Sequence, residues 1–185
     1  MYYLEDDVIG LRGLEMEDVY NGYGNWLNDS VVCEFNSHHR FPVVINEMEE
    51  FVKHCQRDDT RIVLAVELKQ GKVHIGNISL QNINFIDSHA EIAFLFGNKE
   101  YWGRGYATKA ARLLINHAFM ELGLNRIYFG TSEENVGMQK IGEKLNFHRG
   151  GVRRQALYKH GHYVDIYDYD ILRKEWALAS QVEDK

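Results

Sequence analysis

The sequence predicts a single α+β domain, and three observations carry this prediction. Strand-like alternation opens the chain and then gives way to a helical spacing of apolar residues. Three β-branched and aromatic runs follow one another in the middle of the chain, separated by turn-like residues. The chain has 185 residues, 45% of them hydrophobic, and it contains no internal repeat, low-complexity stretch or linker. One well-filled core is therefore expected over residues 1–185, with residues 176–185 as a loose tail.

The first third of the chain predicts one strand and two helices. Residues 8–14 alternate apolar and polar side chains, as a short strand does. Residues 15–27 carry apolar side chains at helical spacing, and residues 45–55 place five apolar residues on one helical face with charged residues opposite. We therefore expect a strand, a helix and, after a loop, an amphipathic second helix.

The middle of the chain predicts an antiparallel unit of three strands. Residues 62–66, 73–85 and 91–96 are rich in β-branched and aromatic side chains. The segments between them, 69–72 and 87–88, are composed of typical turn residues. Because such short connections join antiparallel neighbours, the three strands are expected to be linked by hairpins.

The C-terminal half predicts two helices and three further strands. Apolar residues recur at a spacing of 3.6 from Ala107 to Leu122, and Gly123 is a typical left-handed stop for that helix. The remaining pattern predicts a strand at 126–131, a helix at 133–145 with Ser132 as its N-cap, and strands at about 147–154 and 162–172.

Composition argues against several classes of function. The formal net charge is −6, whereas a protein that grips nucleic-acid phosphates or an anionic membrane is normally basic. The two cysteines, Cys33 and Cys55, stand in no disulfide or metal-ligand spacing, and no metal site is predicted. The N-terminus lacks the order of a signal peptide, and no apolar run approaches the ~18 residues of a membrane span. A cytoplasmic protein is expected.

The segment that carries chemistry runs from an apolar strand through a glycine-rich turn into the long helix. A helix N-terminus presents free backbone N–H groups and a positive dipole end, so it binds anions. Gly103 and Gly105 remove side chains that would hold an anion away from the backbone, and Arg104 adds positive charge. Walker and dinucleotide loops fit poorly, because GxxxxGK[ST] is absent and the turn follows antiparallel strands.

This turn resembles the pyrophosphate loop of the GNAT superfamily of acyl-CoA-dependent N-acyltransferases, which has the form [Q/R]xxGx[G/A]. Residues 102–107 match that form with one departure, Trp102 in place of Gln or Arg. The order of the predicted elements extends the resemblance over most of the chain, toward the branch of ribosomal-protein N-terminal, spermidine and amino-sugar acetyltransferases. The resemblance implies a mixed, mostly antiparallel central sheet with helices on both faces and strands that splay at the acyl-CoA site.

The resemblance also implies contacts with acetyl-CoA. In that fold the pantetheine arm takes a strand-like place between the splayed strands, where it would pair with backbone groups of Leu95, Phe96 and Gly97. The pyrophosphate would lie on Trp102, Gly103, Arg104, Gly105, Tyr106, Ala107 and Thr108. Residues 135–147 resemble the family segment NxxAxxLYxKxGF. By that resemblance Asn135 would orient the cofactor and Lys140 would reach a phosphate.

Amine acylation by a thioester needs a neutral amine, a group that polarises the carbonyl and a proton for the leaving thiolate. By resemblance Glu91 would receive the amine proton, directly or through water, and the backbone N–H of Leu95 would donate to the thioester oxygen. A carboxylate paired within the hairpin is an equally good interpretation of Glu91. Gly142 occupies the position of the family's tyrosine acid. The thiolate would then leave unaided, take a proton from water, or use another residue such as Tyr158 or Tyr163.

The sequence therefore predicts an acetyl-CoA-dependent N-acetyltransferase that acts by direct attack of a primary amine and uses no metal. The acceptor is left open among a protein N-terminus, a polyamine and an amino sugar, and the chain is expected to be a monomer or homodimer without nucleic-acid or membrane partners. The alternative is a non-catalytic CoA-binding or sensory module of the same fold. Residues 97–159 carry a net charge of +6 and the rest −12, which predicts salt-sensitive CoA binding and a cationic acceptor.

Overall fold

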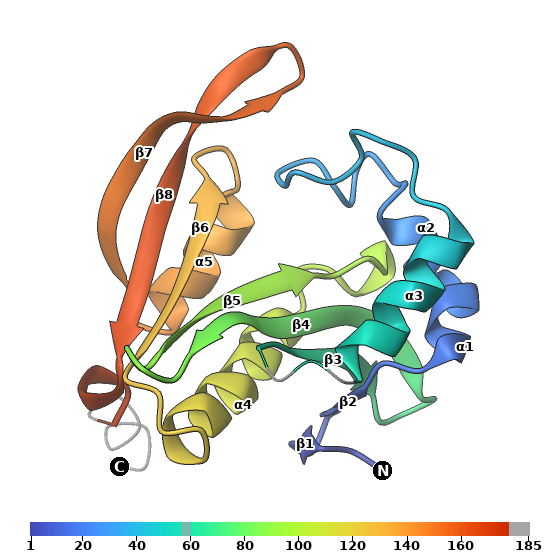
Figure 1. The fold of residues 1–185 in the computed structure, drawn as a ribbon, viewed down its shortest axis with the longest axis horizontal. Helices are drawn as coiled ribbons and strands as arrows, with labels where there is room; N and C mark the ends of the chain where they lie inside the picture. The colour runs from blue at the N-terminus through green and yellow to red at the C-terminus, as the bar shows by residue number, and fades with distance from the viewer. Residues whose placement is uncertain (57, 59, 178–185) are drawn as a thin grey trace.

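The structure is a computed structural model that describes residues 1–56, 58 and 60–177. Its helices and strands follow the predicted order of strand, helices, three strands, helix, strand, helix and two strands, with the short strand β1 and the short helix η2 as additions that were not predicted (Figure 1). In chain order they are β1 (Leu4–Glu5), β2 (Ile9–Gly13), α1 (Met16–Asp18), η1 (Val19–Tyr23), α2 (Gly24–Trp26), α3 (Ile45–Cys55), β3 (Ile62–Leu68), β4 (Val73–Asn84), β5 (His89–Leu95), η2 (Lys99–Tyr101), α4 (Tyr106–Met120), β6 (Arg126–Ser132), α5 (Val136–Lys144), β7 (His148–Lys159) and β8 (His162–Leu172).

Across the described residues, the strands form one sheet of eight in the order β1-β2-β3-β4-β5-β6-β8-β7. Every neighbouring pair is antiparallel except β5 and β6, which run parallel. A parallel pair needs a crossover connection, and α4 supplies it between these two strands. The prediction of a mixed, mostly antiparallel α+β sheet is thus confirmed.

Helices cover both faces of the sheet. Successive side chains of a strand point to opposite faces, and apolar side chains on both faces pack into two separate cores. The larger core packs the alanine-rich face of α4, with Ala110, Ala111 and Leu114, against one face of the sheet. A second core packs η1, α2 and α3 against the opposite face, through Val19, Trp26 and other apolar side chains. Figure 1 shows α4 and α5 on one side of the sheet and α1 to α3 on the other. We refer to the side of α1 to α3 as the front face.

The parallel strands β5 and β6 separate after a short paired stretch. His89, Ala90 and Glu91 lie opposite Arg126, Ile127 and Tyr128, and no further pair joins the two strands. The strands β5 and β6 nevertheless continue to Leu95 and Ser132, so they diverge as a V that Figure 1 shows opening toward their C-terminal ends. The unpaired edge of β5 therefore offers backbone groups to a ligand along the gap.

The predicted helix over residues 15–27 is broken into three short pieces. α1, the π-helical turn η1 and α2 replace it, because Gly22 takes a φ of 129° that no continuous helix contains. By contrast, the amphipathic helix predicted over residues 45–55 matches α3. Apolar spacing predicted the buried face correctly in both segments, but it did not reveal the kink.

Two further expectations at the C-terminal end were wrong. The N-cap of α5 is Asn135, whose side chain accepts a hydrogen bond from the Met138 N–H at 3.0 Å. Ser132 is instead the last residue of β6. Trp176, expected in a loose tail, is 4% exposed and packs in the main core, with its ring 6.3 Å from that of Phe119. Residues 178–185 of that expected tail lie outside the described residues.

Candidate active site

The glycine-rich turn ends where α4 begins, beside the open end of the V. Gly103 and Gly105 have φ angles of 73° and 82°, which L side chains rarely adopt, and Gly105 is the N-cap of α4. A β-carbon added at either glycine would meet nothing within 4 Å. The turn therefore leaves open space over the free N–H groups of a 15-residue helix, which suits an anionic group.

Trp102, the departure from the family motif, fastens this turn to the end of β5. Its indole N–H donates a 2.7 Å hydrogen bond to the backbone carbonyl of Phe96. Beside it, the guanidinium of Arg104 lies 5.3 Å from the ring centre of Tyr101, a cation–π contact that leaves its charge at the turn. The first turn of the helix holds Tyr106, Ala107 and Thr108 in half-buried positions.

Gly97 is required by close packing where β5 ends. A β-carbon at Gly97 would lie 1.9 Å from the ring of Trp26, which is buried in the front core. Because that contact is with a large buried ring, the position tolerates no side chain without displacing α2. The backbone at Leu95 to Gly97, which was predicted to pair with the pantetheine arm, is therefore held in place from the front face by Trp26.

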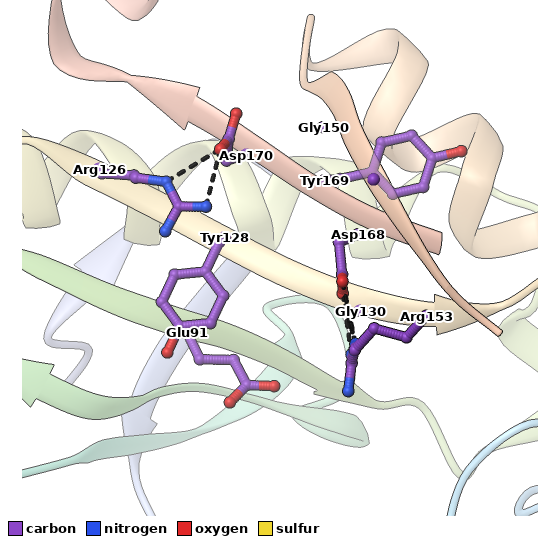
Figure 2. A pocket seen from close by; sticks show the side chains of 10 residues that line it. Glu91, Arg126, Tyr128, Gly130, Gly150, Arg153, Asp168, Tyr169 and Asp170 are labelled. Carbon is purple, nitrogen blue, oxygen red and sulfur yellow. Dashed lines mark hydrogen bonds and ion pairs between the residues drawn. The ribbon is translucent and has the colours of Figure 1, made fainter. Parts of the chain in front are cut away.

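A pocket of about 470 Å³ lies where β5 and β6 part, on the front face of β6, β8 and β7. Glu91 and Tyr128, which lie opposite each other in the last β5–β6 pair, stand at one side of it (Figure 2). Two ion pairs line the remainder, Arg126 with Asp170 at 2.7 Å and Arg153 with Asp168 at 2.8 Å. The other lining residues are Gly130, Gly150, Gly151 and Tyr169.

Glu91 is the carboxylate of this pocket that forms no ion pair within the described part of the chain. It accepts a 3.1 Å hydrogen bond from the side-chain amide of Asn82. Asn82 has a φ of 51° in an irregular stretch of the β4–β5 pairing between Gln81 and Asn84, so a strained backbone aims its amide at Glu91. Burial and then the charge of Glu91 raise the pKa of Tyr128.

Glu91 and Leu95 are too far apart for direct proton transfer between them. They are four residues apart on one strand, which separates their α-carbons by about 13 Å. A glutamate side chain spans only part of that distance. Any proton that passes between an amine near Leu95 and the Glu91 carboxylate therefore needs bridging water, and the pocket beside Glu91 has room for it.

Helix α5 packs tightly against the sheet at Gly142, the position of the family's tyrosine acid. A β-carbon on Gly142 would lie 3.0 Å from the ring of Phe129 and 3.4 Å from that of Tyr169. Those two rings stack with centres 4.9 Å apart and planes 10° from parallel. The usual position of the tyrosine acid is thus filled by packing between helix and sheet.

The remaining predicted residues lie outside the pocket lining. Asn135 caps α5 with its side-chain oxygen, and Lys140 is exposed on the same helix. Tyr158 and Tyr163 face each other at the end of the β7–β8 hairpin, with ring centres 4.8 Å apart and both largely exposed. Neither tyrosine lines the pocket that contains Glu91.

Sequence reasoning missed Asn82, Arg126, Tyr128 and both aspartates of the pocket. One signal was available: Asp168 and Asp170 stand two apart on a predicted strand, so they share one face. In the described residues no group of three His, Cys, Asp or Glu side chains could hold a metal ion. No helix among the same residues is long and apolar enough to span a membrane.

The fold and this site define an acetyltransferase domain, and comparison with known proteins gives the same class. The sequence profile of the acetyltransferase (GNAT) domain matches residues 9–148. The protein named "Putative ribosomal N-acetyltransferase YdaF" of Bacillus subtilis is 37% identical over 101 residues, which span 55% of this chain and 55% of that protein. The spermidine N(1)-acetyltransferase of Escherichia coli is 28% identical over 156 residues, covering 84% and 81% of the two chains.

A solved structure shows the same fold over nearly the whole chain. The spermidine N-acetyltransferase of Vibrio cholerae, in complex with CoA and spermine, superposes with a TM-score of 0.84 at 24% identity. The superposition covers 93% of this chain and 99% of that one. The chain belongs to the GNAT acetyltransferase family and is an acetyl-CoA-dependent N-acetyltransferase.

Proposed function

We propose that the chain transfers the acetyl group of acetyl-CoA to a primary amine that enters the pocket beside Glu91. The carrying observation is the position of Glu91, a carboxylate without an ion-pair partner among the described residues, at the point where β5 and β6 part. Relatives named as spermidine acetyltransferases support an amine as acceptor. The excess negative charge of the pocket favours an acceptor that arrives as an ammonium ion.

Different residues of the chain have different roles in the reaction. Bound acetyl-CoA supplies an activated thioester. Glu91 accepts, through water, the proton that the ammonium must lose before its nitrogen can attack. The N–H of Leu95, at the end of β5, donates to the thioester oxygen as negative charge develops there. Water in the pocket supplies the proton for the leaving thiolate, because Gly142 carries no acid.

The alternative function, a CoA-binding or sensory module without turnover, is tested by free-thiol release. Acetyl-CoA is mixed with a polyamine, a short peptide with a free N-terminus, or glucosamine, and thiol formation is followed. We expect release with at least one amine, together with thermal stabilisation by CoA alone. Stabilisation by CoA without thiol release on any amine would favour the module.

The affinity for CoA is expected to fall as salt rises, because the proposed phosphate contacts are electrostatic. Calorimetric titration of CoA at increasing NaCl should give a rising Kd. Arg104→Gln removes the guanidinium beside the turn, so it should raise Kd at low salt and flatten the salt dependence. Arg154→Gln, an exposed change on β7, serves as the control. A Kd that does not respond to salt would contradict the phosphate contacts.

Asn82 is expected to position Glu91, and two variants separate that role from backbone strain. Asn82→Gly keeps a positive φ without strain but removes the hydrogen bond to Glu91. Loss of a hydrogen bond to a charged group corresponds to about 1.5 kcal/mol, or roughly tenfold in kcat/KM. Asn82→Ala should show the same kinetic loss together with a lower Tm. Wild-type kcat/KM in Asn82→Gly would remove Asn82 from the mechanism.

A further inference from the structure

Arg153 reaches the pocket from the edge of the sheet, two strands away from β6. It lies on β7 opposite Ile166 of β8, and the β7–β8 register shifts on both sides of it. Its guanidinium donates three hydrogen bonds of 2.8 to 3.1 Å to the carboxylate of Asp168 on β8. This two-pronged contact orients the plane of the guanidinium, although the side chain of Arg153 is 58% exposed.

A glycine on β6 provides the space that the guanidinium occupies. Gly130 lies directly opposite Asp168 in the sheet. A β-carbon at Gly130 would lie 2.3 Å from Nη2 of Arg153 and 3.0 Å from Oδ1 of Asp168. Any other residue at position 130 would therefore force the guanidinium to move from this position.

Arg153 keeps hydrogen-bonding capacity after its contact with Asp168. Within the described part of the chain Nε and Nη2 donate to Asp168, whereas Nη1 donates to no residue. Figure 2 shows the guanidinium in the same pocket as Glu91, to the right of the Glu91 carboxylate in this view. The hydrogen bond and charge of Asp168 and, after them, the charge of Glu91 raise the pKa of Arg153. Glu91 and Arg153 are therefore close enough to contact the same bound molecule.

These observations assign complementary chemistry to the two sides of the pocket. Glu91 suits an ammonium group, and the unused edge of a neutralised guanidinium suits a carbonyl oxygen. A plain di- or polyamine carries only hydrogen-bond donors when protonated, so it leaves the Arg153 side unpaired. An aminoacyl group carries both features, because its carbonyl lies on the carbon next to the amine.

We propose that Arg153, placed over Gly130 by Asp168, is a specificity-determining residue. It selects acceptors whose primary amine is on a carbon that is bonded to a carbonyl group, as at a peptide N-terminus. The inference rests on the proposed function, since it assumes that the amine is acetylated in this pocket. Arg153 touches the acceptor and not the reacting thioester. It sets KM and the choice among amines.

The test compares two acceptors in free-thiol release from acetyl-CoA: a tripeptide amide with a free N-terminus and spermidine. Wild-type protein should have the higher kcat/KM with the peptide. Gly130→Ala displaces the guanidinium without changing any charge, and it should lower kcat/KM for the peptide about tenfold or more through KM, while spermidine changes little. The double variant R153Q/D168N, which keeps the net charge of the pocket, should behave in the same way.

Two controls keep the outcomes distinct. Arg154→Gln removes a neighbouring positive charge on the same strand outside the pocket, and it should leave the peptide-to-spermidine ratio as in wild type. Circular dichroism and CoA titration show whether each variant is folded. An equal loss with both acceptors, or a wild-type preference for spermidine, would overturn the role of Arg153 alone. The absence of thiol release with every amine tested would overturn the proposed function instead.

Discussion

Glu91→Gln is expected to lower turnover by about 10²- to 10⁴-fold, the range that a positioned general base contributes. The substitution keeps the shape of the side chain and an oxygen that can accept from the Asn82 amide, whose hydrogen bond to Glu91 is 3.1 Å long. It removes the charge that would accept the proton of the amine. Steady-state thiol release with a saturating amine measures the effect on kcat.

CoA binding should be unaffected by the same change, because Glu91 lies four residues from Leu95 and away from the glycine-rich turn. Calorimetric titration should therefore give the wild-type Kd. Glu121→Gln at the exposed end of α4 makes the same chemical change outside the pocket and serves as the matched control. Equal kcat/KM for wild type and Glu91→Gln across pH would show that Glu91 takes no part in proton transfer.

Asp18→Asn is expected to give the largest loss of stability. Asp18 is 4% exposed, and both its oxygens accept hydrogen bonds from Arg12, at 2.7 and 2.8 Å. Arg12 also donates to Glu67 at 3.0 Å. Breaking a buried ion pair from one side costs about 3–5 kcal/mol, which for a domain of this length lowers Tm by roughly 6–20 °C. Thermal unfolding followed by circular dichroism measures the change.

The loss of stability caused by Asp18→Asn depends on pH. Burial raises the pKa of Asp18, but the hydrogen bonds from Arg12 and His74, together with its weaker contacts, outweigh burial and hold the pKa well below its ordinary range. The stabilisation is therefore complete above about pH 4, the ordinary pKa of an aspartate, and is lost as the pH falls further. The Tm difference between wild type and Asp18→Asn should narrow on acidification below pH 4.

An exposed ion pair provides the control for this stability prediction. Glu50 and Lys53 pair on the surface of α3 with side chains 75% and 52% exposed. Glu50→Gln should leave Tm unchanged, because solvent screens such pairs. A Tm for Asp18→Asn within error of wild type would contradict the account of the buried network.

The parts of the fold that could be predicted are those whose signal is local. Residues 45–55 carry a complete amphipathic pattern, and α3 has the same bounds. The glycine-rich turn could be recognised because its function needs particular residue types at fixed spacing. The kink at Gly22 could not be predicted, since a glycine is compatible with a helix until tertiary packing imposes a positive φ.

The pocket was largely hidden from sequence reasoning, because strand pairing assembles it from distant segments. Glu91 belongs to β5, whereas Arg153 and Asp168 come from β7 and β8 and reach the site across the sheet. The order β6-β8-β7 places β8 between its two sequence predecessors, an arrangement that periodicity does not encode. The role of Gly130 likewise depends on the guanidinium of Arg153 that lies over it, and this contact joins residues far apart in the sequence.

The most direct test of the central account is a crystal structure of the protein with CoA bound. We expect the pyrophosphate on the turn from Gly103 to Thr108, the pantetheine arm along the unpaired edge of β5, and the sulfur near the N–H of Leu95, with Glu91 facing it across ordered water. CoA bound elsewhere, with the gap between β5 and β6 closed or empty, would contradict it.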